Sequence, residues 1–250
     1  MPFTFSHPAA VLPLLRAAGA RGPLVASALV AGSMAPDVPF FAESLLPGAY
    51  GHGGLTHRWW AVPTVDVAIA AALVAGWHGL LRAPLVGLLP ERRAGGVEAL
   101  TVRRAEGGGS SRGAGAAWFL ASAALGAATH VGWDAFTHGG RLGVRLLPVL
   151  DRTVAGVPLH EALQYGSSAL ALVALAGWAG RAVRAVEPVR PAVRLAPGAR
   201  RAAVVALGAA TVAGVLQRVA PLRRNLVPEM CFGAGAGLAV GALGYAAVVA

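Results

Sequence analysis

Apolar residues along this chain form long runs rather than alternating with polar positions. A helix needs about 20 mostly apolar residues to cross the hydrocarbon core of a bilayer. Runs that approach or reach this length occupy 61–81, 114–134, 166–183, 202–217 and 231–249. Two shorter runs, 8–20 and 23–35, precede them and predict a hairpin of short helices that dips into the membrane and returns. The pattern predicts an all-α polytopic membrane helical bundle, with about five spanning helices plus an N-terminal short-helix hairpin.

Composition strengthens the membrane prediction. Hydrophobic residues make up 56% of the 250 residues and charged residues only 13%, whereas about a quarter of a soluble domain is charged. Mean hydropathy is +0.62, so lipid is the natural solvent for this surface. We expect one integral-membrane domain over 1–250, made of a core (1–180), an arginine- and proline-rich loop (181–201) and two generic C-terminal spans (202–250).

The basic residues predict how the spans are oriented. All 21 are arginines, and they cluster between the apolar runs. When the segment 82–113 and the loop 181–201 are placed in the cytoplasm, fourteen arginines fall inside and seven outside, in agreement with the positive-inside rule. Arg218, Arg223 and Arg224 fall outside and violate the rule locally. We expect a multi-pass protein of the cytoplasmic (inner) membrane.

The same features limit the partners and the site chemistry. The segment 82–113 contains the run GGGSS at 107–111 and is predicted to be a mobile polar loop. Its arginines are not interleaved with aromatic residues, so we expect no nucleic-acid partner. Cys231 is the only cysteine, which excludes an internal disulfide and a cysteine-based metal site. Membrane lipid is the partner that the composition supports.

Histidines and acids collect on one membrane face of this topology. The residues placed at the outer ends of the apolar segments are His7, Asp37, His52, His57, His130, Asp134 and His138. The orientation depends on the arginines alone, so this convergence is a separate observation. Ionisable residues at membrane depth are costly unless they pair or bind a ligand, and a functional site is therefore the default hypothesis.

The stretch THVGWDAFTHGG at 129–140 carries the densest group of these residues. His130 and Asp134 lie one helical turn apart and share a face, and His138 lies on the next turn if the helix persists. An imidazole and a carboxylate on one face can bind the same zinc, manganese or iron ion. Alternatively, His130 and Asp134 form a hydrogen-bonded structural pair without metal.

Other polar residues have simpler explanations. His78 and His160 fit ordinary interfacial positions, and Asp37 fits a turn cap. Asp66 lies one turn inside a span, where it either pairs with a threonine or with Arg58, or orients a ligand histidine from outside the coordination sphere. Thr56, directly before His57, is a candidate helix cap.

Several motifs together resemble a known family: MPFTFSHPAAVLPL, GSMAPDVPFF, GLTHRWW, THVGWDAFTHGG and LQYGSS. The resemblance is to a family of bacterial integral-membrane proteins, domain of unknown function 4184, and runs through roughly residues 1–180. That family is distantly similar to inner-membrane metal-dependent hydrolases. By its order of His and Asp it is also similar to the zinc-dependent phospholipase C and P1 nuclease group of all-helical phosphoesterases.

The resemblance implies a set of metal ligands: His7, Asp37, His57, His130 and Asp134, with His138 as a sixth. The chain lacks the N-terminal tryptophan and the later H-x-x-x-E pair of the soluble phosphoesterases. The resemblance therefore implies one or two divalent ions, with zinc favoured, rather than a three-zinc cluster.

Two functions fit this pattern. The first is a membrane-embedded metal-dependent hydrolase, in which the metal activates a water for attack on a phosphoester. Asp134, His138 and Arg58 are the expected catalytic residues, with Arg58 or Arg141 binding a phosphate. The expected substrate is a phospholipid or lipid-linked compound at the extracytoplasmic face. The alternative is a non-enzymatic transporter or scaffold with a buried His/Asp network, although no internal repeat typical of transporters is evident.

Overall fold

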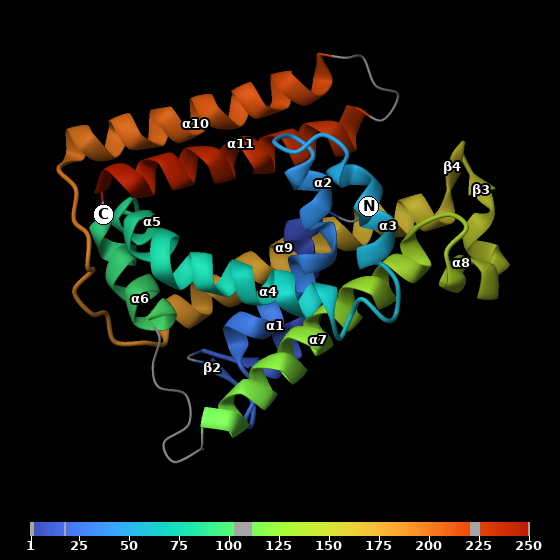
Figure 1. Ribbon diagram of the computed structural model, residues 1–250, viewed down its shortest axis with the longest axis horizontal. Coiled ribbons are helices and arrows are strands. Elements are labelled where there is room, and N and C mark those ends of the chain that lie inside the picture. Colours follow the sequence, from blue (N-terminus) through green and yellow to red (C-terminus); the bar gives the residue numbers. More distant parts are fainter. Residues whose placement is uncertain (1–2, 18, 103–111, 221–225, 250) are drawn as a thin grey trace. The chain divides into compact units, whose positions relative to one another are not determined.

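The computed structural model describes residues 3–17, 19–102, 112–220 and 226–249, and helices dominate this part of the chain (Figure 1). Five helices in it are long and apolar enough to cross a membrane: Val65–Gly87, Gly113–Thr137, Leu159–Arg184, Pro197–Val219 and Leu226–Val249. The predicted all-α polytopic architecture is confirmed. Among the described residues, strands occur only as two hairpins of two residues per strand.

Each long helical segment extends at one end or at both beyond the apolar run that predicted it. Their bounds are α4 Val65–Gly76, α5 Arg82–Gly87, α7 Arg112–Thr137, α9 Leu159–Arg184, α10 Pro197–Val219 and α11 Leu226–Val249. A π-helical segment, η4 (Trp77–Leu81), joins α4 to α5. The first span starts at Val65, later than predicted, because residues 61–64, which include Pro63, form turns.

The N-terminal hairpin differs in kind from the two short helices predicted. Residues 4–14 form a 3-10 helix, η1 (Thr4–Leu14), with Pro8 and Pro13 inside it. A proline lacks the N–H that an α-helix needs, so this segment does not form a regular α-helix. Strands β1 (Leu15–Arg16) and β2 (Gly19–Ala20) form the turn that follows.

Shorter elements complete the described chain. Helix α1 (Ala26–Met34) is followed by the 3-10 turn η2 (Ala35–Asp37). The others are α2 Val38–Ala42, η3 Ala49–His52, α3 Gly53–Thr56, α6 Glu91–Thr101, α8 Leu142–Leu146, η5 Pro148–Asp151, β3 Thr153–Val154 and β4 Val157–Pro158.

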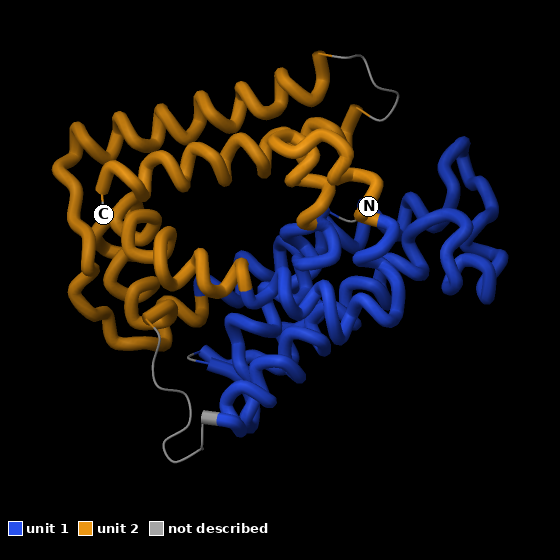
Figure 2. The backbone as a smooth tube through the Cα atoms, viewed as in Figure 1, with its two compact units in different colours: residues 1–37, 54–71, 107–180 blue, residues 38–53, 72–106, 181–250 orange. Residues whose placement is uncertain are grey.

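The chain forms two compact units (Figure 2). Unit 1 contains residues 1–37, 54–71 and 107–180, and unit 2 contains residues 38–53, 72–106 and 181–250. In unit 1, η1, α1 and α7 pack together. A small apolar core of Val11, Leu15 and Leu29 supports this packing.

Helices α1 and α7 approach each other closely in unit 1 because small residues face one another. A Cβ atom at Gly32 would overlap the backbone of Ala123, and one at Gly126 would overlap the backbone oxygen of Leu29. Glycine allows such backbone-to-backbone contact, as it commonly does between membrane helices. This contact places the C-terminal turn of α1 beside the second half of α7.

Substituting Gly126 by alanine should therefore destabilise unit 1. The added methyl group would lie 2.8 Å from the Ser33 backbone nitrogen, and such overpacking costs about 1–3 kcal/mol. Gly132→Ala in the same helix is the matched control, because a Cβ at that position would meet no described atom within 4 Å. Thermal unfolding in detergent should show a lower midpoint for Gly126→Ala only. Equal midpoints for the two variants would contradict the close approach.

In unit 2, part of the predicted polar loop is helical, which corrects the prediction of a mobile segment over 82–113. Residues 82–87 continue the first span as α5, and residues 91–101 form α6. The Arg82 guanidinium pairs with Glu98 on α6, and the Val189 N–H donates to the Gly95 carbonyl over 3.1 Å. These partners are remote in sequence, so local composition does not reveal them. The GGGSS run lies outside the described residues.

Candidate metal centre

Helix α7 brings two of the predicted ligands to one place in unit 1. His130 and Asp134 are fully buried, and the His130 Nε2 atom lies 3.7 Å from Asp134 Oδ2. A spacing of four residues places both side chains on one helix face. The pairing that the H-x-x-x-D pattern predicts is therefore present.

A backbone carbonyl sets the orientation of the His130 ring. Its Nδ1 atom lies 2.8 Å from the Ser33 carbonyl oxygen, and a carbonyl can only accept, so Nδ1 is the protonated donor. Ser33 belongs to the last turn of α1, where carbonyls lack partners within the helix. In the neutral ring the other nitrogen, Nε2, then carries the lone pair that a metal ligand needs.

Asp37, at the end of η2, contributes a carboxylate to the same place. The Thr4 hydroxyl donates to its Oδ2 atom. Its Oδ1 atom has no hydrogen-bond partner among the described residues and lies 3.5 Å from His130 Nε2. Burial alone would raise the pKa of Asp37, but His130 and the Thr4 hydrogen bond outweigh burial and hold the pKa below its ordinary value. The carboxylate is therefore ionised at neutral pH.

His57 completes the group from the residue after α3. The Thr56 hydroxyl donates to the Pro36 carbonyl over 2.6 Å, which ties the end of α3 to η2 and fixes the position of the next residue. Thr56 is thus a link between segments and not the helix cap predicted. The His57 Nε2 atom lies 3.2 Å from Asp134 Oδ2 and 3.6 Å from Asp37 Oδ1.

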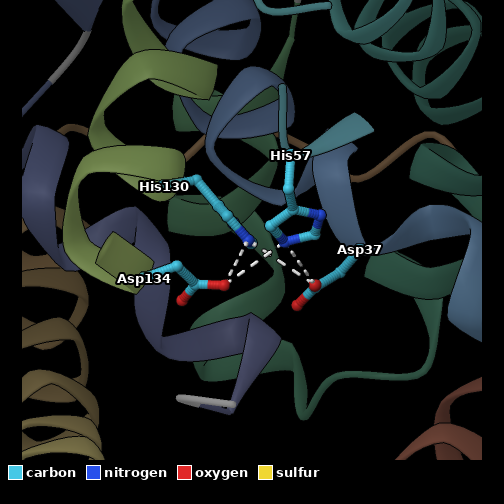
Figure 3. Close-up of side chains that lie close together, drawn as sticks. All are labelled: Asp37, His57, His130 and Asp134. Carbon is cyan, nitrogen blue, oxygen red and sulfur yellow. Dashed lines mark ion pairs between the residues drawn. The ribbon is translucent and has the colours of Figure 1, made fainter. Parts of the chain in front are cut away.

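Ligand atoms of Asp37, His57, His130 and Asp134 all lie within 4.8 Å of one another (Figure 3). The four measured nitrogen–oxygen separations run from 3.2 to 3.7 Å. Tetrahedral zinc with bonds of about 2.0–2.2 Å spaces its ligands about 3.3–3.6 Å apart. Only the His57–Asp134 separation is within hydrogen-bonding range. The other atoms are directed toward a common point, and the donor set of two imidazoles and two carboxylates fits a divalent metal ion.

His7, on η1, lies against this group. Its ring stacks on the His130 ring, with centroids 3.6 Å apart, and its Nε2 atom lies 3.6 Å from Asp134 Oδ1. Burial, with the nearby His130, lowers the pKa of His7 to about 3, so the ring is neutral at physiological pH. Neither ring nitrogen has a hydrogen-bond partner in the described part of the chain. His7 therefore offers a lone pair on the Oδ1 side of Asp134.

His138 also reaches Asp134, although not from a further helical turn. Helix α7 ends at Thr137, because glycines follow at 139 and 140. The His138 Nδ1 atom lies 3.2 Å from the Asp134 carbonyl oxygen and 3.6 Å from its Oδ1. Burial lowers the pKa of His138 to about 4. The ring is neutral, with Nδ1–H donating to the carbonyl and Nε2 unprotonated.

The remaining predicted residues lie in different surroundings. Arg58 and His52 are exposed and Arg141 is half-buried. The His160 Nδ1 atom donates to the Leu150 carbonyl over 3.1 Å, in agreement with its simple structural explanation. Asp66 is fully buried, and neither of its carboxylate oxygens has a hydrogen-bond partner among the described residues, so the predicted pairing with threonine or Arg58 is wrong.

Sequence reasoning missed three groups that position the ligands: Thr4, the Thr56–Pro36 bond and the Ser33 carbonyl. Thr4 lies three residues before His7, which is one turn of a 3-10 helix. This spacing was a signal in the sequence that Thr4 shares a face with His7 and therefore lies near the site. A backbone carbonyl such as that of Ser33 carries no signal in the sequence.

One family model matches the chain, that of Domain of unknown function (DUF4184), over residues 1–247. This match includes all the residues of the candidate site. It also extends past residues 1–180, where the motifs lie, through the last two spans. No curated protein and no solved structure matches the chain.

Proposed function

The chain belongs to the family described as Domain of unknown function (DUF4184), and we propose that it is a membrane-embedded metal-dependent hydrolase. The observation that carries this proposal is the buried group of Asp37, His57, His130 and Asp134, whose ligand atoms lie within 4.8 Å of one another. Burying ionisable residues in a helical membrane protein costs free energy, so such residues typically mark functional sites. The proposed cofactor is a divalent metal, zinc, as one or two ions.

The residues that would hold such an ion are themselves fixed by neighbouring groups. The Ser33 carbonyl fixes His130, the Thr4 hydroxyl fixes Asp37 and the Thr56 link fixes His57. Asp134 presents Oδ2 to His57 and His130 and Oδ1 to His7 and His138. This carboxylate is placed to serve a second ion together with His7. When bound, zinc supplies a Lewis acid and a water of lowered pKa.

The proposed substrate is a phosphoester in a phospholipid or lipid-linked compound, at the extracytoplasmic face of the inner membrane. Arg58 directly follows His57 and is exposed, so its guanidinium is available to bind a phosphate. His138 has an unprotonated Nε2 that can accept a proton during the reaction. Asp134 orients His57, whose Nε2 atom lies 3.2 Å from its Oδ2 atom. The resemblance of the His/Asp order to the zinc-dependent phospholipase C and P1 nuclease group supports this reaction class.

Elemental analysis and an activity panel test the proposal. Protein purified in detergent should contain zinc or another divalent metal at one or two ions per chain. It should hydrolyse at least one phosphomonoester or phosphodiester in a panel of phospholipids and lipid-linked phosphates. Chelation should remove the activity, and added metal should restore it. Metal-free protein that stays inactive after incubation with zinc, manganese and iron would refute the proposal.

A non-enzymatic transporter or scaffold is the alternative, and the same buried residues are the observation that favours it. Imidazoles and carboxylates in contact can form a proton or ion path through membrane helices. Substituting His130 by alanine separates the two functions. Metal content should fall if the group is a metal centre, whereas transport or assembly should change at constant metal content if it is a polar path.

Replacing Thr4 by valine should weaken metal binding without removing it. The substitution keeps the side-chain shape but deletes the hydroxyl that donates to Asp37. Loss of such an outer hydrogen bond typically costs about 10–100-fold in metal affinity. Competition with a chromophoric chelator measures the change. Thr4→Ser should retain the wild-type affinity, and Thr153→Val on the exposed strand β3 is the unrelated control. Equal affinities for Thr4→Val and wild type would show that Asp37 needs no support.

A further inference from the structure

Residues 141–158 connect two membrane-spanning helices of unit 1 at the end that carries the candidate metal centre. Helix α7 ends at Thr137 and α9 begins at Leu159. Figure 1 shows α8, β3 and β4 as a small lobe beyond these helix ends, in yellow-green. Because both neighbouring helices are long enough to span a bilayer, the lobe emerges at one membrane surface.

The lobe is folded and not a loose connection. Strands β3 and β4 pair antiparallel, and the Leu159 N–H extends the hairpin by donating to the Arg152 carbonyl over 2.9 Å. The His160 imidazole donates to the Leu150 carbonyl. Gly143 lies directly against Phe136 of α7. The side chains of the lobe therefore have defined directions.

The lobe combines a few buried residues with many exposed apolar side chains. Gly143 and Val144 face inward and are buried. The exposed apolar residues are Leu142, Leu146, Leu147, Val149, Val154 and Val157, each at least 44% accessible. Connections that face water rarely expose so many large apolar side chains within so short a stretch, and exposed apolar surface of this kind indicates a binding surface.

Positive charge accompanies this apolar surface. Arg145 lies beside Leu146 on α8, and Arg152 precedes the hairpin; both are exposed. Apolar side chains flanked by arginines are typical of segments that lie in the interface of anionic membranes. Trp59, two residues after His57 in the same unit, is 83% exposed, and tryptophan favours the level of the lipid headgroups.

We propose that residues 141–158 form a lipid-binding lobe seated in the headgroup layer of the leaflet beside the candidate metal centre. Leu142, Leu146 and the hairpin residue Val154 enter the boundary with the acyl chains. Arg145 and Arg152 contact the phosphates of anionic lipids. The proposal goes beyond the hydrolase function and does not depend on it, since it concerns the surface of the lobe alone.

Spin-label depth measurement tests this directly, because the chain has one native cysteine. In a Cys231→Ala background, labels are attached at Leu146→Cys and, separately, at Val154→Cys, two exposed positions where folding is not at risk. The protein is reconstituted in phosphatidylcholine vesicles with and without phosphatidylglycerol. Relative accessibility to oxygen and to a water-soluble nickel complex then gives the depth of each label.

Both labels should lie roughly 5–10 Å inside the headgroup boundary, and deeper when phosphatidylglycerol is present. Leu170→Cys, 74% exposed on α9, calibrates the hydrocarbon core. Glu187→Cys, at an exposed polar position outside the spans and outside the lobe, calibrates the aqueous side. Accessibility equal to that at Glu187 would place the lobe in water and overturn the proposal. Low accessibility to both reagents would indicate a second copy or another protein on this surface, which also overturns it. A depth independent of phosphatidylglycerol would remove the role of the arginines.

Discussion

Replacing Asp134 by asparagine should abolish metal binding at the centre. We expect the metal affinity to fall by more than about 100-fold, which is the largest loss that removing an outer hydrogen-bond partner typically causes. Among the described residues, Asp134 is the one carboxylate whose two oxygens face four imidazoles, those of His7, His57, His130 and His138. The amide of asparagine has nearly the same shape, but it has lost the charge that compensates a cation. Elemental analysis of the purified protein provides the primary measurement.

Thermal unfolding separates this loss from general damage to the fold. A ligand at a hundredfold excess over its dissociation constant stabilises a folded protein by about 2.7 kcal/mol. Zinc should therefore raise the unfolding midpoint of the wild type above its value in chelator, and Asp134→Asn should show no such difference. Asp151→Asn, at a position with a 68% exposed side chain, should behave as wild type. If Asp134→Asn kept the metal content and the zinc response of wild type, the proposed centre would be wrong.

The fold was predictable where its signal is local. A run of about 20 apolar residues, such as 231–249, indicates a span because its length as a helix matches the hydrocarbon core of a bilayer. Helix ends were less predictable. The first turns of α9, Leu159–Gln164, are polar, so they belong to the helix but not to the apolar run that predicted it. Helix α6 was missed for a different reason. Its support comes from Val189 and Arg82, which are not its neighbours in sequence.

The residues that gather at the candidate site were predictable from the sequence, but the groups that hold them in place were not. The four-residue spacing of His130 and Asp134 indicated their shared face, and the arginine distribution placed Asp37 and His57 at the same membrane surface. The tautomer of His130 depends on the Ser33 carbonyl, which becomes available only because α1 ends one residue later. The contact between the Ser33 carbonyl and the His130 ring depends on where α1 ends beside α7, and the residue types in the sequence do not reveal that position.

The last two spans also carry more information than their composition suggests. They were expected to be generic, yet α10 and α11 of unit 2 contact closely at Gly214 and Gly233. Arg218 on α10 and Glu229 on α11 form a buried ion pair with a separation of 2.7 Å between Nε and Oε2. The Arg218 guanidinium also lies over the Tyr50 ring, 5.9 Å from its centroid. Arg218 is one of the arginines that the predicted orientation places on the outer side, and the ion pair with Glu229 compensates its charge.

Replacing Arg218 by methionine should destabilise unit 2 by about 3–5 kcal/mol, the usual cost of leaving one member of a buried ion pair without its counter-charge. The double variant Arg218→Met/Glu229→Leu should recover most of this loss, because an apolar pair needs no desolvation. The single thiol, Cys231, lies two residues from Glu229, so its reaction with a maleimide dye on heating reports unfolding of this region.

The exposed ion pair of the same unit provides the matched control. Arg194 and Glu91 are 3.0 Å apart, with side chains 57% and 79% exposed, and exposed pairs contribute about 0–1 kcal/mol. Arg194→Met should therefore shift the unfolding midpoint little. If the double variant is as unstable as Arg218→Met alone, the guanidinium stabilises the contact between α10 and α11 through Tyr50 and packing instead. Similar small shifts for Arg218→Met and Arg194→Met would show that water screens the charge on α10, because only a dry surrounding makes the loss of one partner costly.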